Sequence, residues 1–385
     1  MPSRLSANGS LFLLVFSQFA GTSVWFAGNA ITDQIATADA GATITSFVQF
    51  GFIAGTLVFS LLTVADRFQA STVFFYSSLL AAAANLLLAV YYKDASTIKL
   101  LRFATGFFLA GIYPVGMKIA ADVAPQKLGR ALGWLVGALV LGTSFPHLVR
   151  SRLEGIQWEI VVITTSLLAA LGGVLVFLFI PRRKKQGNTT KPEFLGAFAL
   201  FKSPSFRSAA FGYFGHMWEL YAFWAILPLL FTHLNALWQI SSNVYWWSFL
   251  VIAAGSAGCI AGGYLSQRWG SKKVAATALL LSGACCAVFP LVANLNLTFA
   301  FGLLLFWGFA VTADSPQFSA LVAKAAPEKN RGTALTIVTS IGFAITIASI
   351  LLLKDVFLHH KEKALWLLLP GPVLGLFAMR KNDLV

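Results

Sequence analysis

The amino-acid sequence predicts an all-α membrane protein with twelve membrane-spanning helices, and three observations support this fold class. First, 58% of the 385 residues are hydrophobic and only 11% are charged, whereas a soluble domain usually carries about 25% charged residues. Second, the apolar residues form continuous runs rather than the short alternating strands of a β-barrel. Third, twelve helices of about 20 residues would leave loops and tails of only about 11 residues each, which is too short for a soluble domain.

Twelve apolar runs are the predicted spans, with ends placed to within about four residues. They are residues 10–32, 43–65, 72–92, 98–121, 129–149, 158–180, 206–231, 243–265, 272–293, 296–322, 332–353 and 364–380. We do not expect the first run to be a cleaved signal peptide, because it is long and contains Gln18, Trp25 and Asn29.

The basic residues indicate how the chain is oriented in the membrane. With the N-terminus inside, nineteen of the 28 Lys and Arg residues lie on the cytoplasmic side, seven lie outside, and two, Arg102 and Lys118, lie within spans. Basic loops favour the cytoplasm, so we expect a multi-pass protein of the plasma (inner) membrane with both termini cytoplasmic. The same distribution explains the net charge of +14 without a nucleic-acid partner, because no basic patch is interleaved with stacking aromatics.

The longest polar stretch, residues 181–204, divides the predicted spans six and six. We therefore predict an N-terminal six-helix half at residues 1–180, a cytoplasmic linker at 181–205 and a C-terminal six-helix half at 206–385.

Three short matches relate the two predicted halves. Residues 65–73 match 266–274 at an offset of 201, and at an offset of 202 residues 124–130 match 326–332 and Pro114 matches Pro316. Matches at a nearly constant offset, each in an equivalent place, indicate a parallel repeat.

The repeated loop between the second and third spans of each half carries a motif. Its second copy fits the pattern Gly-x-x-x-Asp-Arg-x-Gly-x-basic-basic except for a glutamine in place of the acid, with Gly263, Gln267, Arg268, Gly270, Lys272 and Lys273. The first copy keeps Asp66 and Arg67 but lacks the glycines and the basic pair, and span 4 adds Arg102 and Gly106. Over essentially the whole chain these residues resemble the major facilitator superfamily, although span 5 lacks the Gly-Pro-x-x-Gly-Gly ending of its proton-antiporter branch.

This resemblance implies two pseudo-symmetric halves that give alternating access to a central cavity, without a cofactor. We expect a monomer surrounded by membrane lipids. We also expect the repeated loops to gate the cytoplasmic side, where arginines can meet acids or helix C-termini. The candidate gate residues are Asp66, Arg67, Arg130, Gln267, Arg268 and Arg331. The alternative is that these charges only set the orientation.

Three ionisable residues inside the C-terminal spans are candidates for coupling transport to protons. Glu219 lies near the middle of span 7, and His216, three residues earlier, shares its helix face. Asp314 lies in span 10, just before Ser315-Pro316 interrupts the helix. Ionisable groups within a membrane are costly, so each is a functional candidate, and burial disfavours a charged carboxyl.

We expect Glu219 to be the main titrating group, Asp314 the second and His216 a proton relay. The structural alternatives are a Glu219 that bonds to a neighbouring helix, a packing role for His216 and an Asp314 that caps the segment after the break. Sodium coupling would use similar carboxylates, so sodium is the second candidate after the proton.

The resemblance also implies that spans 1, 4, 7 and 10 line the substrate cavity. The candidate lining residues on these spans are Gln18, Trp25, Asn29, Arg102, Tyr113, Phe223, Trp307 and Gln317. Those of span 1 share one helix face at spacings of seven and four. The alternative for this polar face is hydrogen bonding between helices, and the alternative for Arg102 is neutralisation of a carboxylate on another helix.

Together these features predict a secondary active transporter of a small organic solute, anionic or zwitterionic because Arg102 could bind a carboxylate bidentately. The alternative is a proton-driven exporter of amphipathic drugs or metabolites. A membrane enzyme or receptor is disfavoured because no constellation such as His-Glu-x-x-His occurs, and the repeat argues against a channel. The five histidines are scattered and the three cysteines lack metal-ligand spacing, so no bound metal is expected.

Overall fold

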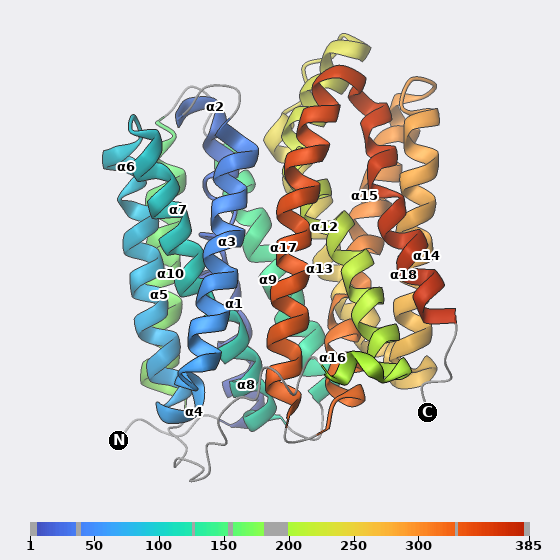
Figure 1. Ribbon diagram of the computed structural model, residues 1–385. Coiled ribbons are helices and arrows are strands. Elements are labelled where there is room, and N and C mark those ends of the chain that lie inside the picture. The colour runs from blue at the N-terminus through green and yellow to red at the C-terminus, as the bar shows by residue number, and fades with distance from the viewer. Residues whose placement is uncertain are drawn as a thin grey trace. The chain divides into compact units, whose positions relative to one another are not determined.

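The computed structural model describes residues 6–35, 40–124, 128–152, 157–180, 199–327 and 330–380. Within these ranges the chain is helical and contains no strand (Figure 1). The chain divides into two compact units, Met1–Pro192 and Glu193–Val385. Their boundary falls inside the predicted linker, of which residues 181–198 lie outside the described ranges.

Two helices of the N-terminal unit start at polar side chains that cap them. The described helices of this unit are α1 (Ala7–Thr22), the 3-10 helix η1 (Asn29–Ile31), α2 (Thr32–Ile35), α3 (Ala40–Leu61), α4 (Val64–Arg67), α5 (Ala70–Leu86), α6 (Leu88–Tyr91), α7 (Ala95–Leu109), α8 (Tyr113–Val123), α9 (Leu128–Ser151) and α10 (Glu159–Phe179). At the start of α1 the side chain of Ser6 accepts from the N–H of Gly9, and at the start of α7 that of Asp94 accepts from Ser96 and Thr97. Such caps satisfy backbone donors that a helix start leaves without a partner.

In the C-terminal unit, asparagines cap two helices. This unit contains the 3-10 helix η3 (Ala199–Lys202), α12 (Pro204–Trp238), α13 (Val244–Trp269), α14 (Ser271–Val292), α15 (Leu297–Ala313), α16 (Ser315–Ala325), α17 (Arg331–His360), the 3-10 helix η5 (Lys361–Leu368) and α18 (Pro370–Arg380). Asn243 caps α13 through the N–H of Trp246 at 3.0 Å, and Asn296 caps α15 through that of Phe299 at 2.9 Å.

The first span differs from its prediction as one continuous helix over residues 10–32. Helix α1 ends at Thr22, and helical structure resumes only at Asn29. The hydroxyl of Thr22 donates to the carbonyl of Gln18 at 2.8 Å and that of Ser23 to the carbonyl of Ala20 at 2.7 Å. Thr105 and Thr165 make the same kind of bond inside helices that continue, so the two hydroxyls accompany the end of α1 and do not by themselves explain it.

The fourth and tenth spans are each interrupted just before a proline, as the sequence predicts for span 10. Helix α7 ends at Leu109 and α8 begins one residue before Pro114, while α15 ends at Ala313 and α16 begins one residue before Pro316. Proline lacks a backbone N–H and is tolerated in the first turn of a helix. Each proline therefore starts a new helix after the break.

Ten helical stretches in the described residues are long and apolar enough to cross a membrane. Nine correspond to the predicted spans 2 to 10, and the tenth, Arg331–Arg380, covers the last two predicted spans. The first predicted span does not reach this length because α1 has only 16 residues. These stretches indicate an integral, multi-pass membrane protein.

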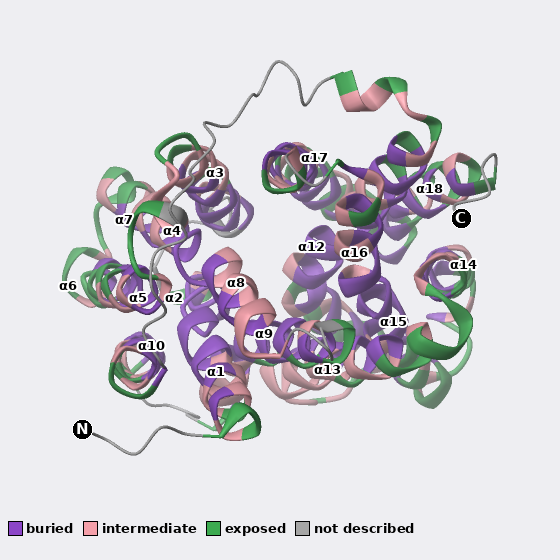
Figure 2. Cartoon of the chain, turned by 90° about the horizontal axis from the view of Figure 1, so that it is seen from below, coloured by how far each residue is buried: buried purple, intermediate pink, exposed green. Residues whose placement is uncertain are grey.

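Helices of the same unit pack through glycines at equivalent positions. A Cβ atom at Gly106 of α7 would lie 2.0 Å from the carbonyl oxygen of Val48 on α3, and one at Gly308 of α15 would lie 2.0 Å from that of Val251 on α13. Small residues let helix backbones approach this closely in membranes. Figure 2 shows buried residues on the inner faces of each unit, while outer faces expose large apolar side chains such as Leu167, as contact with lipid requires.

Candidate functional site

Glu219 lies near the middle of α12 with its side chain fully buried. The hydroxyl of Ser282 on α14 donates to Oε2 at 2.9 Å. The other oxygen, Oε1, accepts from the thiol of Cys286, also on α14, at 3.3 Å and from the indole N–H of Trp307 on α15 at 2.6 Å. Within the described residues these neutral donors, rather than a cation, satisfy the carboxylate.

Two predicted cavity residues belong to the same assembly. The rings of Phe223 and Trp307 stack with centroids 4.2 Å apart and planes inclined by 21°, and both side chains are fully buried. Phe223 lies one turn after Glu219, so both face α15. We call Glu219, Phe223, Ser282, Cys286 and Trp307 the Glu219 cluster.

The other two predicted coupling residues form a second buried pair in this unit. His216 Nδ1 lies 2.9 Å from Asp314 Oδ1, and His216 Nε2 lies 2.8 Å from the hydroxyl oxygen of Ser315. The distance between His216 and Asp314 is that of an ion pair, although its geometry is not that of a hydrogen bond.

The pair lies at the break in the tenth span. Asp314 separates α15 from α16, and its backbone carbonyl accepts from the N–H groups of Gln317 and Phe318, both at 2.9 Å. Its side chain makes no capping hydrogen bond, so the cap foreseen as the structural alternative is absent at this position. His216 contacts the break directly through Ser315.

Arg102 is buried in the N-terminal unit, where three acceptors engage its guanidinium. One terminal nitrogen donates to the side-chain oxygen of Asn85 on α5 at 2.9 Å, and the other donates to the backbone carbonyls of Val24 and Trp25. These two carbonyls follow the end of α1, where the helix ladder no longer needs them. The N–H at Nε has no hydrogen-bond partner within the part of the chain that the structure describes.

Asn85 in turn connects Arg102 to α10. Its amide nitrogen lies within 3.0–3.3 Å of the Ser166 and Thr165 hydroxyls and of the Val162 carbonyl oxygen. Both the oxygen and the nitrogen of the Asn85 amide are therefore engaged, and the guanidinium is anchored to the segment after α1, to α5 and, through Asn85, to α10.

The predicted polar face of the first span does not stay on one helix. The indole of Trp25 donates to Gln49 on α3 at 3.3 Å, and Asn29 lies in η1. Gln18 remains on α1, fully buried, and neither polar atom of its amide has a hydrogen-bond partner among the residues that the structure describes. Trp25 thus contacts both Gln49, through its indole, and Arg102, through its carbonyl.

The last two predicted cavity residues lie next to the helix breaks. Tyr113 is half-buried at the start of α8, and Gln317 is buried in the first turn of α16. Their positions after the two breaks are equivalent to within two residues.

The predicted gate residues occupy the ends of helices. Arg67 ends α4, Arg130 lies in the first turn of α9, and Arg268 lies in the last turn of α13, all exposed. Arg331 donates to the carbonyl of Ala323 in the last turn of α16 at 2.9 Å, and Gln267 donates to the carbonyl of Gly263 at 3.4 Å. The side chain of Asp66 lies outside what the structure describes. The gate itself stays a prediction.

Several contact residues escaped the sequence analysis. Ser282, Cys286, Asn85 and Gln49 all lie in predicted spans other than the four assigned to the cavity. One signal was available, because Asn85 and Cys286 are 201 residues apart, the offset of the repeat that begins their helices. Each contacts the buried charged group of its own unit.

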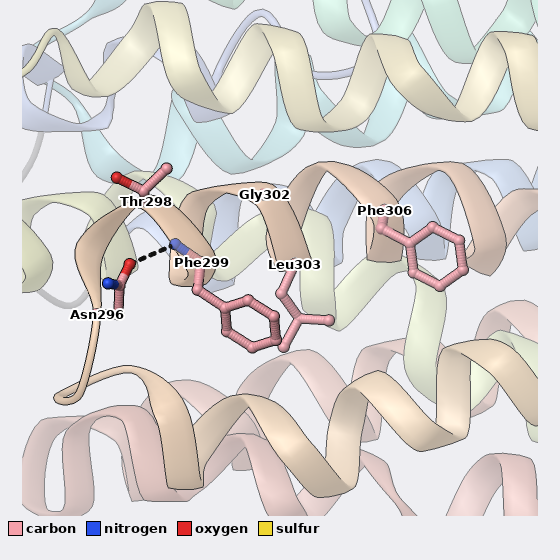
Figure 3. A pocket seen from close by; sticks show the side chains of 6 residues that line it. All are labelled: Asn296, Thr298, Phe299, Gly302, Leu303 and Phe306. Atoms are coloured by element: carbon pink, nitrogen blue, oxygen red, sulfur yellow. Dashed lines mark hydrogen bonds between the residues drawn. The ribbon is translucent and has the colours of Figure 1, made fainter.

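The three cysteines are free and buried, and no group of three or more potential ligands that could hold a metal ion occurs within the described residues. The outer face of α15 carries an open groove of about 700 Å³, lined by Asn296, Thr298, Phe299, Gly302, Leu303 and Phe306. Figure 3 shows the two phenylalanines along this face. None of the six is a predicted site residue.

The sequence is similar to transporters from two bacteria. It is 27% identical to the uncharacterized transporter YgaY of Escherichia coli (strain K12) over 209 residues, 51% of this chain and 51% of the relative. It is also 27% identical to the uncharacterized MFS-type transporter YybF of Bacillus subtilis (strain 168) over 119 residues, 29% of this chain and 30% of the relative. The chain therefore spans at most about half the length of these relatives.

The fold is similar to that of a solved transporter. A bacterial homologue of the human lysosomal transporter Spinster, in an inward-facing and unoccupied conformation, matches with a TM-score of 0.67 and 13% identity over 98% of this chain and 95% of the other. A sequence profile described as Major Facilitator Superfamily matches residues 10–350. Because this match covers most of the sequence, the chain belongs to the major facilitator superfamily.

Proposed function

We propose that the protein is a proton-coupled secondary active transporter that moves a small organic solute across the plasma (inner) membrane by alternating access. In this proposal twelve membrane-spanning helices form two six-helix halves with both termini cytoplasmic. The observation that carries the proposal is the Glu219 cluster. It holds a fully buried carboxylate in the middle of an apolar helix with neutral donors only, and such costly groups in membranes serve ion or substrate handling.

Glu219 would couple protons to transport by changing its charge during the cycle. A conformation that favours the neutral carboxyl becomes more populated when a proton binds, because a ligand shifts an equilibrium by its differential affinity. Asp314 and His216 form the second site, at the α15–α16 break, where a change of charge could alter how the two helix segments meet. The gate residues would then close the cytoplasmic side.

The first candidate substrate is a small organic anion or zwitterion. Arg102 supports this class because it carries a charge that proteins do not neutralise and because its buried N–H at Nε has no acceptor among the described residues. The residues proposed to contact the solute are, in the N-terminal unit, Arg102 with Gln18, Trp25, Asn29 and Tyr113, and, in the C-terminal unit, Phe223, Trp307 and Gln317.

The second candidate is a proton-driven exporter of amphipathic compounds. The stacked rings of Phe223 and Trp307 beside Glu219 support it, because aromatic faces and a carboxylate together attract a lipophilic cation. A thermal-shift screen of the purified protein over metabolites and lipophilic cations separates the two. Stabilisation only by lipophilic cations would reject the anion.

Proteoliposomes under an imposed pH gradient test the coupling. We expect the unmodified protein to concentrate the solute found in the screen, and Glu219→Gln, which resembles the neutral carboxyl, to exchange solute across the membrane but not to concentrate it. Asp355→Asn, which removes an exposed carboxylate at the end of α17, is the matched control and should behave like the unmodified protein. Accumulation by Glu219→Gln equal to that of the unmodified protein would make Glu219 structural, and accumulation that follows a sodium gradient alone would replace the proton by sodium.

A further inference from the structure

We infer that Ser282 is a positioning residue that directs the proton to Oε2 of Glu219, and that reorientation of its hydroxyl lets Glu219 change charge while the cluster keeps its arrangement. This inference rests on the proposed function, in which Glu219 is the titrating group. It follows from which partners of the carboxyl can only donate a hydrogen bond and which can also accept one.

Oε1 cannot readily carry the proton. An indole N–H donates and never accepts, and that of Trp307 points at Oε1 from 2.6 Å. A hydrogen on Oε1 would oppose this N–H as well as the thiol hydrogen of Cys286. Because the Trp307 ring is stacked on Phe223, the indole is held in place. Oε1 therefore stays an acceptor in both charge states.

Oε2 has a partner that can reverse its role. A serine hydroxyl donates one hydrogen bond and accepts others, and it rotates to suit its surroundings. Ser282 lies 2.9 Å from Oε2 and also 3.2 Å from the carbonyl oxygen of Leu279, one turn earlier on α14. The hydroxyl thus has two acceptors within reach from one position.

The two charge states then differ by one rotation. When Glu219 is charged, Ser282 donates to Oε2. When a proton arrives from hydronium, an O–H bond forms at Oε2 and a water molecule is left. The new O–H donates to the Ser282 oxygen, whose own hydrogen turns to the Leu279 carbonyl. Every polar atom of the cluster keeps a partner in both states, which avoids the cost of an unpaired buried group.

Few other ionisable groups surround the carboxyl. Cys285 and Cys286 lie beside it on α14, Asp314 lies at the α15–α16 break, and His216 is one turn away on α12. From α13 the thiol of Cys259 donates to the carbonyl of Thr312. The charged side chains described on α13, α16 and α18 lie in the terminal turns of those helices, whereas α17 carries Lys354 and Asp355 in the second turn before its end. Ser282 is thus the neutral group whose hydrogen bond must change with the charge of Glu219.

The test compares three variants in the proteoliposome assay. Ser282→Ala removes the acceptor for the new O–H, and we expect accumulation driven by a pH gradient to fall by about tenfold or more, the size of one buried hydrogen bond, while solute exchange stays within about twofold of the unmodified protein. Ser282→Thr keeps a hydroxyl and should restore accumulation. Ser349→Ala, the matched control, removes a buried hydroxyl that donates to the Thr346 carbonyl of its own helix, α17, and should leave accumulation within about twofold of the unmodified protein.

An infrared spectrum distinguishes this role of Ser282 from a packing role, because a packing role would not change the vibrational frequency of the carboxyl group. The C=O stretch of a protonated carboxyl, assigned by its loss in Glu219→Gln, should have the lower frequency of a hydrogen-bonded acid in the unmodified protein and in Ser282→Thr. It should shift upward in Ser282→Ala. If Ser282→Ala does not fold, the C=O band of protonated Glu219 in the unmodified protein tests the inference instead. A band at the frequency of an acid without hydrogen bonds would overturn the inference.

The outcomes for Glu219 and Ser282 are distinguishable. If Glu219→Gln still concentrates solute, the proposed function fails. If Glu219→Gln loses accumulation but Ser282→Ala keeps it, only the role of Ser282 is overturned. Failure of Ser282→Thr to restore accumulation would also overturn that role, because the hydroxyl is what the inference requires.

Discussion

The two units keep the same supporting contacts at matched positions and differ in the charged group that each buries. Asp94 and Asn296, 202 residues apart, cap α7 and α15, and Gly106 and Gly308 at the same offset admit a neighbouring helix backbone. In contrast, the N-terminal unit buries Arg102, whereas position 304 at this offset is a leucine. The repeat thus preserves how the helices start and pack, but not their chemistry.

The partners of the two charges explain what each centre can do. Arg102 is held by Asn85 and by two backbone carbonyls, all acceptors in fixed positions. A guanidinium does not lose its proton in proteins, so this centre holds one charge state. Glu219 is held by three neutral donors, one of them a rotatable hydroxyl. The first centre is therefore suited to fixing the unwound end of α1, and the second to titration.

Substitutions at the glycine contacts that the two units share should lower the free energy of unfolding most, and by similar amounts in both units. Gly106→Ala and Gly308→Ala each place a Cβ 2.0 Å from a backbone carbonyl oxygen, so we expect each to lower the free energy of unfolding by about 3 kcal/mol. Gly302→Ala, which meets nothing within 4 Å, is the control and should be neutral or slightly stabilising. Thermal unfolding in detergent measures all three. Two very different losses would show that the units do not share this contact.

The two charged centres should separate stability from transport. Arg102→Ala leaves the Asn85 oxygen and two carbonyls without their donor, and we expect a loss of about 2–3 kcal/mol, because each buried acceptor left unpaired is costly. Glu219→Gln keeps an acceptor for Trp307 and should cost less than about 1 kcal/mol. The same thermal unfolding, with transport measured in parallel, checks this contrast. If Glu219→Gln loses as much stability as Arg102→Ala, the proposed contrast between a stabilising centre at Arg102 and a titrating centre at Glu219 is wrong.

The matched pair Asn85 and Cys286 refines the contrast within the repeat. Asn85→Ala removes the anchor between Arg102 and α10, so we expect a loss of about 1–2 kcal/mol. Cys286→Ala leaves Trp307 on the same carboxylate oxygen and should cost roughly 0.5–1 kcal/mol. Thermal unfolding midpoints in detergent show which of the two variants, Asn85→Ala or Cys286→Ala, loses more stability. The reverse order would mean that Cys286 does more than donate one weak hydrogen bond.

The sequence predicts the spans well because long apolar runs determine them. It does not predict the early end of the first span, because the apolar run continues past Thr22 through Val24, Trp25 and Phe26. The predicted end of the seventh span at residue 231 also falls short, because α12 continues to Trp238. Apolar residues define the part in lipid and say little about helical turns beyond it.

The candidate site was predictable only in part, for a related reason. Glu219, Phe223 and Trp307 were identified because an ionisable or large aromatic residue is conspicuous in an apolar span, and the structure brings them together. Ser282 and Cys286 were not, because a serine or cysteine in a span is equally compatible with plain packing. The carbonyl partners of Arg102 could not be foreseen either, since they become available only where α1 ends.

The smallest effect concerns the helix caps, where the units differ by one charge. The hydroxyl of Thr97 and the N–H groups of Ser96 and Thr97 donate to Asp94 and hold the pKa of its carboxyl below the ordinary value. A lowered pKa in the folded state stabilises the fold at pH values above the ordinary pKa of an aspartate, about 3.9, and this contribution is lost as the pH falls through the folded-state pKa. Asn296, at the equivalent cap, does not titrate.

We therefore expect Asp94→Asn to flatten the dependence of the unfolding midpoint on pH between neutral and acid conditions. The difference from the unmodified protein should be largest near neutrality and should vanish as the carboxyl becomes protonated. Asn296→Asp is the matched converse, because it places a titrating cap on α15 and should steepen the same curve. Thermal unfolding in detergent over a pH series measures both variants against the unmodified chain, so that carboxylates elsewhere cancel. Parallel curves for Asp94→Asn and the unmodified protein would mean that the cap contributes nothing that depends on its charge.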